Sequence, residues 1–171
     1  RGTVVLPHGT GRKVRVLVFC KDNNIEIAQN AGADYAGGAD LVQKIQEGWL
    51  DFDAVVATPD MMPVISKVAR VLGPRGMMPS PKAGTVTVNV AQTVKELKAG
   101  KISYRVDKGS NVHAPVGKLS FTADQLAENA KAVIDSVVKN KPQSSKGTYI
   151  KSLTLTATMA PGIKLDMALT R

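Results

Sequence analysis

Hydrophobic residues follow two periods along residues 13–100. Short β-branched runs, KVRVLVFC at 13–20 and FDAVVATP at 52–59, lack strict alternation and predict strands buried on both faces. ADYAGG at 33–38 predicts a brief third strand. Helical spacing marks the segments between and after them, namely NIEIAQNAGA at 24–33, ADLVQKIQEGW at 39–49, PDMMPVISKVARVLG at 59–73 and VAQTVKELKAG at 90–100. Strands alternating with helices predict a parallel sheet covered on both faces.

The pattern changes after residue 100. KISYRVDKGSNVHAPVGK at 101–118 predicts two strands joined by a turn at DKGSN. TADQLAENAKAVIDSVVKNK at 122–141 predicts a long amphipathic helix that begins near Thr122. TYIKSLTLTATMAP at 148–161 predicts a long strand that ends at Pro161. This order of elements favours an α+β domain.

These elements alone make a thin domain, and the opening run GTVVLP at 2–7 offers it a further strand. We therefore expect a fold of mixed class, α/β and α+β, with two domains. A discontinuous α+β domain comprises residues 1–8 and 101–171, and a three-layer α/β domain, residues 9–100, is inserted into it. Both crossings, LPHGTG and LKAGK, contain glycine, which suits either a hinge or a simple turn.

Charge separates the same regions. The net charge is +9, and residues 101–171 carry 11 Lys/Arg against 5 Asp/Glu, whereas residues 20–66 are acidic. This asymmetry indicates a polyanion-binding half, although a generically basic protein is the simpler alternative. The single cysteine, Cys20, excludes an internal disulfide and is expected in the core. No metal site, cofactor or membrane partner is expected.

The last predicted strand has two different faces. Successive strand residues point to opposite sides, so one face carries hydroxyls and the other carries apolar side chains. The hydroxyl face comprises Ser152, Thr154, Thr156 and Thr158, and the apolar face comprises Leu153, Leu155 and Ala157. The cations in the same part of the chain are Lys108, Lys118, Lys146, Lys151 and Lys164. Such a face suits the 2′-hydroxyls and phosphates of a folded RNA, but Thr is also a common half-exposed strand residue.

The loop LGPRGMMPSPKAGTVT at 72–87 admits two interpretations, a phosphate-cradling enzyme loop or a nucleic-acid contact. It lacks the Gly-Lys-Ser/Thr ending of a nucleotide-binding loop, and APVGKLS at 114–120 has Leu119 in place of that Ser/Thr. GADYAGG lacks the glycine spacing of dinucleotide-binding sites. We expect no enzyme and no catalytic residue. A nucleotide-binding α/β enzyme and a scaffold whose basic face serves solubility are the alternatives.

Several motifs together resemble one known family. RGTVVLPHGTG, GADYAGG, FDAVVATPDMM, LGPRGMMPSPKAGTVT, HAPVGK, KGTYIKS and TATMAP are similar, in this order, to the first-numbered protein of the large ribosomal subunit. That family is the rRNA-binding protein of the mobile stalk, and this chain resembles its bacterial and organelle members over essentially all 171 residues. Because the chain opens on Arg1 and a strand-like run, we expect an N-terminal segment of the split domain to be missing.

The resemblance implies the residues that bind RNA. Contacts to the stalk rRNA would come from the end of the last strand and from the turn after residue 106, with neighbouring cations. This set is Asp107, Lys108, Lys118, Lys151, Ser152, Thr154, Thr156, Thr158, Met159 and Ala160. Arg75 and Lys82 would be secondary contacts to rRNA or exit-site tRNA. The chain departs from the usual pattern at Ala160 (usually Gly), Gly109 (commonly Thr) and Gly162 (commonly Ser).

The resemblance also implies a function without catalysis. The protein would anchor to the stalk rRNA of the large subunit and help tRNA leave the exit site. It would also repress translation of its own mRNA by binding a leader that mimics the rRNA site. Its partners would then be the stalk rRNA, exit-site tRNA and its own mRNA leader, and its location would be the ribosome of a bacterial cytoplasm, chloroplast stroma or mitochondrial matrix.

Overall fold

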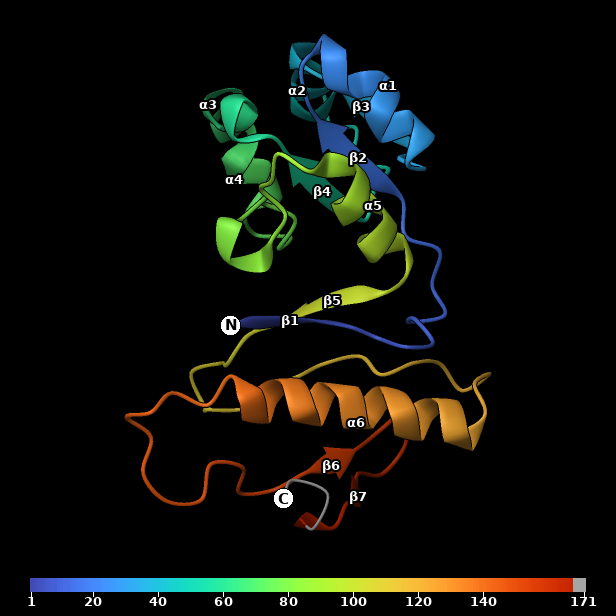
Figure 1. Ribbon diagram of the computed structural model, residues 1–171, viewed down its shortest axis with the longest axis vertical. Coiled ribbons are helices and arrows are strands. Elements are labelled where there is room, and N and C mark those ends of the chain that lie inside the picture. The colour runs from blue at the N-terminus through green and yellow to red at the C-terminus, as the bar shows by residue number, and fades with distance from the viewer. Residues whose placement is uncertain (168–171) are drawn as a thin grey trace.

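The computed structural model describes residues 1–167, leaving aside the side chains of residues 22 and 23. The fold mixes helices and strands (Figure 1), as expected. None of the helices described is long and apolar enough to cross a membrane. In chain order the elements are β1 (Gly2–Val5), β2 (Val16–Phe19), α1 (Asp22–Asn30), β3 (Tyr35–Gly37), α2 (Ala39–Gln46), β4 (Ala54–Ala57), η1 (Pro59–Met61), α3 (Met62–Ile65), η2 (Ser66–Val68), α4 (Ala69–Leu72), η3 (Pro81–Ala83), α5 (Val90–Lys98), β5 (Lys101–Tyr104), α6 (Ala123–Lys139), β6 (Thr154–Leu155) and β7 (Ile163–Lys164).

A three-stranded parallel sheet organises residues 16–98. Its order is β3-β2-β4, so the first strand in sequence lies in the centre. Leu17 pairs with Tyr35 on one side and with Val55 on the other. All four residues of β2 are fully buried, which explains why this run lacks the alternation of a half-exposed strand. The predicted parallel sheet is confirmed.

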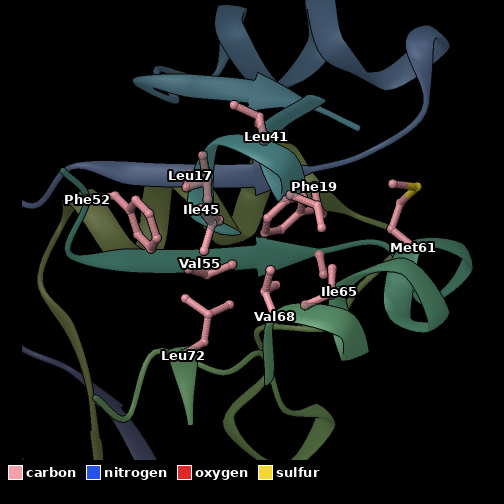
Figure 2. Packing of buried hydrophobic residues seen from close by; sticks show 12 residues of the cluster. Leu17, Phe19, Leu41, Ile45, Phe52, Val55, Met61, Ile65, Val68 and Leu72 are labelled. Atoms are coloured by element: carbon pink, nitrogen blue, oxygen red, sulfur yellow. The ribbon is translucent and has the colours of Figure 1, made fainter. Parts of the chain in front are cut away.

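Helices cover both faces of this sheet and give three layers. On one face, side chains of β2 and β4 pack against α2, α3 and α4 in a cluster of 12 buried residues (Figure 2). On the other face, Val16, Val18 and Val56 pack against α1 and α5. α5 contributes Val94 and Leu97 to this second cluster. The centre of the sheet is therefore shielded from water on both sides.

Residues 59–72 do not form the single helix that their periodicity predicts. They form four short segments, η1, α3, η2 and α4, in which one or two turns of 3-10 and α-helix alternate. Pro59 and Pro63 supply no backbone N–H for a continuous ladder, and Val68 departs from helical geometry at φ −103° and ψ 7°. Ile65, Val68 and Leu72 are nevertheless fully buried, so the predicted apolar face is correct although the continuous helix is not.

The remaining elements pack around α6. β1 and β5 form an antiparallel pair in which Gly2 lies opposite Tyr104, and α6 packs against β1 (Figure 1). The core here is small and comprises Leu6, Ile102 and Val133 with a few half-buried neighbours. α6 begins with a capping box between Thr122 and Gln125, as the sequence predicts. The second strand expected within residues 101–118 is reduced to one bridge between Val106 and Val112.

The two crossings between these regions touch each other. Gly9 (φ 65°) and Gly100 (φ 104°) both have left-handed backbones, and a Cβ on Gly100 would overlap with the backbone of Gly9. Glycine is needed at both positions for conformation and for close approach. Thus β1, which precedes the α/β sheet in sequence, pairs with β5, which follows it. The division into two independent domains stays a prediction.

Candidate nucleic-acid interface

The end of the described chain forms a β-hairpin, where one long strand was predicted. In this hairpin Thr154 lies opposite Lys164, and the N–H of Leu165 donates to the carbonyl of Leu153 at 2.9 Å. Figure 1 shows the hairpin on the opposite side of α6 from β1 and β5. The prediction of a long strand was wrong because, within residues 1–167, strand pairing covers only two residues on each side.

The two faces predicted for residues 152–157 are present. Ser152, Thr154 and Thr156 are exposed, whereas Leu153, Leu155 and Ala157 are half-buried. We call Ser152, Thr154, Thr156 and Thr158 the hydroxyl row. The Thr156 hydroxyl donates to the carbonyl of Ala160 at 3.3 Å and so closes the hairpin loop. The other three hydroxyls make no hydrogen bond within the described part of the chain. They are therefore open to an external partner.

The tip of the hairpin presents Met159 in an unusual backbone conformation. Its φ is 62°, in the left-handed region that non-glycine residues seldom adopt. The Ala160 N–H donates to the carbonyl of Ala157 at 3.1 Å and holds this turn. The Met159 side chain is fully exposed. Strained backbone and an exposed apolar side chain both favour a contact surface over a packing role.

Asp107 organises the turn that carries Lys108. Its carboxylate accepts the N–H of Asn111 at 2.8 Å, and its own N–H donates to the Asn111 carbonyl at 2.9 Å. The Asn111 N–H is the main cause that lowers the pKa of Asp107. His113 lies 3.5 Å from the carboxylate. Asp107 therefore stays ionised and holds the turn, and it leaves Lys108 exposed without an ion pair among the described residues.

The predicted contacts do not all lie together. Asn140, just after α6, donates to the Tyr104 hydroxyl at 2.8 Å, which places the turn of Lys108 near the C-terminal end of α6. The chain then runs back along the helix (Figure 1). Exposed Lys118 consequently lies near the N-terminal end, next to Gly11. Lys151 is exposed just before the hydroxyl row.

The loop at 72–87 belongs to the α/β region, apart from the hydroxyl row. Its backbone is fixed by a bridge between Val86 and Ala57 and by a hydrogen bond from Ser80 N–H to the Thr85 hydroxyl at 2.8 Å. Arg75 is exposed within it. Lys82 lines a cleft with Arg1. The two predicted secondary contacts are thus accessible but separate from the hairpin.

A match to a family of known proteins agrees with these features. Residues 1–161 match the model of the ribosomal protein L1p/L10e family. The chain belongs to this family. The resemblance to this family is confirmed, whereas the bacterial or organelle type and the missing N-terminal segment stay predictions. The enzyme alternative is excluded because the family consists of structural ribosomal proteins. This L1p/L10e family member is a large-subunit ribosomal protein that binds ribosomal RNA, and its location is the ribosome.

The structure adds one residue to the L1-family surface described here. Lys164 lies directly opposite Thr154 in the hairpin, and residues opposite one another in an antiparallel pair point to the same face. Both side chains are exposed, so a cation stands beside the hydroxyl row. The sequence marked Lys164 as a nearby charge but not as a strand partner. A turn assigned to APG at 160–162 would have revealed the pairing.

Chemically, this surface offers hydroxyl groups, cations and one apolar tip. Hydroxyls donate and accept hydrogen bonds, and lysines neutralise phosphates, so the surface suits a ribose–phosphate backbone. Among residues 1–167 no cluster of three or more His, Cys, Asp or Glu side chains has the arrangement of a metal site.

Proposed function

We propose that this L1-family protein anchors to the rRNA of the ribosomal stalk through the hydroxyl row, Met159 and Ala160, with Lys108, Lys118 and Lys151 as flanking cations. Asp107 acts by holding the turn of Lys108. The observation that carries the proposal is the exposure of the row together with the lack of protein partners for Ser152, Thr154 and Thr158 within the described residues.

The remaining roles involve both the hydroxyl row and the inserted domain. Residues 1–8 and 101–171 form the RNA-anchored domain, and residues 9–100 form an inserted domain that moves with the stalk. Arg75 and Lys82 of the inserted domain contact rRNA or exit-site tRNA, and the movement helps tRNA leave. An mRNA leader that folds like the rRNA site competes for the hydroxyl row, and so represses translation of the protein's own mRNA. The protein works in bacterial or organelle ribosomes.

Filter binding to a stalk rRNA stem-loop at several salt concentrations tests the anchoring role. The logarithm of the affinity should fall linearly with the logarithm of the salt concentration, since several phosphates are neutralised. An unrelated hairpin should bind more weakly. Equal affinity for both RNAs would contradict specific anchoring. If substitutions within residues 9–100, and none elsewhere, abolish binding, the RNA site lies in that region instead.

Thr158→Val tests the hydroxyl row directly. It removes an unpartnered hydroxyl and keeps the side-chain shape, so affinity for the stem-loop should fall by about 1–2 kcal/mol with little change in folding stability. Ser103→Ala, at an exposed hydroxyl on β5, is the control and should bind as the wild type does. Unchanged affinity in Thr158→Val would show that Thr158 is only a strand-compatible residue.

Lys108→Ala tests the flanking cations. Removing one phosphate contact should weaken binding and reduce the slope of the salt dependence by about one. An unaltered slope would remove Lys108 from the interface.

A further inference from the structure

A second surface of the protein gathers cations that form no ion pair within the described residues. We propose that this surface, the basic edge, binds the phosphate backbone of RNA independently of the hydroxyl row. The basic edge comprises Arg1, Lys82, Arg105, Lys139 and Lys141. The inference rests on the proposed function only in that the protein binds structured RNA.

The pairing of β1 with β5 brings Arg1 and Arg105 together. Gly2 lies opposite Tyr104 at the end of the antiparallel pair of β1 and β5. The next residues outward are Arg1 and Arg105, which the same register places beside each other. Both are exposed. Residues 104 positions apart in sequence thus form one cationic end of the ladder.

Side-chain hydrogen bonds attach the end of α6 to this ladder. The Tyr104 hydroxyl lies 2.9 Å from the Ser136 hydroxyl and accepts from the Asn140 amide at 2.8 Å. Asn140 is flanked by Lys139 and Lys141, which are both exposed. The end of the ladder and the end of α6 therefore present their cations at one place.

The loop after α6 is held at the same place. Lys141 donates to the carbonyl of Gly147 at 3.3 Å, and its ammonium lies 5.8 Å from the centre of the Tyr149 ring. These contacts position the charge of Lys141 without neutralising it.

The basic edge extends to the α/β region. Arg1 and Lys82 line one cleft of about 520 Å³, and η3, which contains Lys82, contacts β1. Figure 1 shows the N-terminus, η3 and the C-terminal end of α6 on the same side of the molecule. An RNA backbone lying along this side would contact both the α/β region and the part built around α6.

The cations of the basic edge differ from several others in the chain in forming no ion pair. Arg12, Arg15, Lys98 and Lys101 all pair with carboxylates. The five cations of the basic edge form no ion pair within residues 1–167. Two carboxylates lie near, Asp107 in the turn and Asp135 one turn before Lys139, which leaves the edge strongly positive. Unneutralised like charges repel each other and favour a polyanionic partner.

The chemistry of the basic edge selects the backbone of RNA rather than its bases. Of the aromatic rings beside it, Tyr104 is buried and Tyr149 lies beneath Lys141. Base stacking needs open aromatic faces, whereas phosphates need only accessible cations. The basic edge should therefore add affinity without sequence preference.

A charge-neutralising pair tests the proposal in the full chain. Arg105→Gln with Lys139→Gln removes two cations of the edge, and Lys44→Gln with Lys67→Gln removes two exposed, unpaired cations of the α/β region as a matched control. Binding of the stalk rRNA stem-loop and of an unrelated hairpin is measured by filter binding from 50 to 200 mM salt. Thermal unfolding verifies that both variants fold.

The edge variant should bind both RNAs about tenfold more weakly at 100 mM salt, and its salt slope should be smaller by about 1.5–2. The control should change less than twofold, and Arg105→Lys with Lys139→Arg should retain wild-type binding. Equal slopes in the edge variant and the control would overturn the basic edge while the hydroxyl row stands. A wild-type protein that binds neither RNA would overturn the proposed function itself.

Discussion

The α/β region and the part built around α6 use their residues differently. The α/β region buries a sheet between two apolar clusters, and its Arg12, Arg15 and Lys98 pair with carboxylates. The other part has a small apolar cluster built on Leu6, Ile102 and Val133, a long helix and an exposed hairpin. The α/β region is thus held together by its own packing, whereas the part around α6 exposes polar groups that are available to bind a partner.

The difference has an energetic consequence. Burial of apolar area is the main source of folding stability, so the small core around α6 should contribute less of it. The charges and hydroxyls that remain unpaired there contribute on binding RNA, when phosphates and riboses satisfy them. Stability and affinity should therefore respond to different residues.

The largest expected effect compares two isoleucines. Ile65 is fully buried in the cluster of Figure 2, whereas Ile134 on α6 is 6% exposed. We expect Ile65→Ala to lower the free energy of unfolding by about 4 kcal/mol and Ile134→Ala by about 2 kcal/mol, because the tighter site leaves the larger cavity. Urea unfolding measures both. A larger loss in Ile134→Ala would reverse the comparison.

The second effect concerns the buried amide of Asn129. It accepts from His8 N–H at 3.1 Å and donates to the carbonyls of Gly9 and Val116 at 2.9 and 2.8 Å. Asn129→Leu would leave three partly buried backbone groups without their side-chain partner. It should cost about 2–3 kcal/mol of unfolding free energy.

Glu128→Gln is the control for Asn129. Glu128 pairs with His8 at the exposed surface, and exposed pairs contribute little. Its unfolding free energy should change by less than about 1 kcal/mol. If both variants unfold alike in urea, Asn129 does not hold the crossing to α6.

The third effect is acid sensitivity of the α/β region. Partial desolvation raises the pKa of Asp53, but hydrogen bonds from the backbone and guanidinium of Arg15 outweigh it and lower the pKa below 3.8. The pKa of Asp34 is also raised by partial desolvation, and hydrogen bonds from the Val16 N–H and Lys98 outweigh this and lower it. Carboxylates with lowered pKa values stabilise the fold above the unfolded pKa. That stability is lost as pH falls below about 3.8 towards their folded values.

Urea unfolding at pH 7 and pH 3 checks this sign. The wild type should be less stable at pH 3, and Asp53→Asn should reduce the difference between the two pH values. Asp135→Asn, at an exposed position on α6, should leave the difference unchanged. An equal reduction in both variants would show that the acid sensitivity does not arise specifically from the α/β region.

Local periodicity predicted the α/β region well because burial there is two-sided and repeats along each element. It failed where local geometry departs from the period. Pro63 and the irregular backbone of Val68 break the helix at 59–72. The β6–β7 hairpin was missed because Pro161 was interpreted only as the end of a strand, and because turn preferences do not signal the left-handed Met159 in its loop.

The candidate surface divides in the same way. The two faces of residues 152–157 follow from strand alternation alone. The partners of Asn129 lie in distant segments, His8 at the first crossing and Val116 before α6, so nothing near Asn129 in sequence marks it. The neighbouring positions of Arg1 and Arg105 depend on the β1–β5 register. Long-range pairing determines such sites, and a single sequence does not reveal it.

The smallest expected effect tests how closely the hairpin positions the hydroxyl row. A Cβ on Gly162 would lie 2.9 Å from the Thr154 methyl, so Gly162→Ser requires the Thr154 side chain to move. Affinity for the stem-loop should fall about twofold to threefold, and unfolding free energy should change by less than about 0.5 kcal/mol. The displacement acts through Thr154. In a Thr154→Ala background, therefore, Gly162→Ser should have no further effect on affinity. Additive losses in the double variant would mean that residue 162 contacts RNA itself, and that crowding of Thr154 does not explain the change.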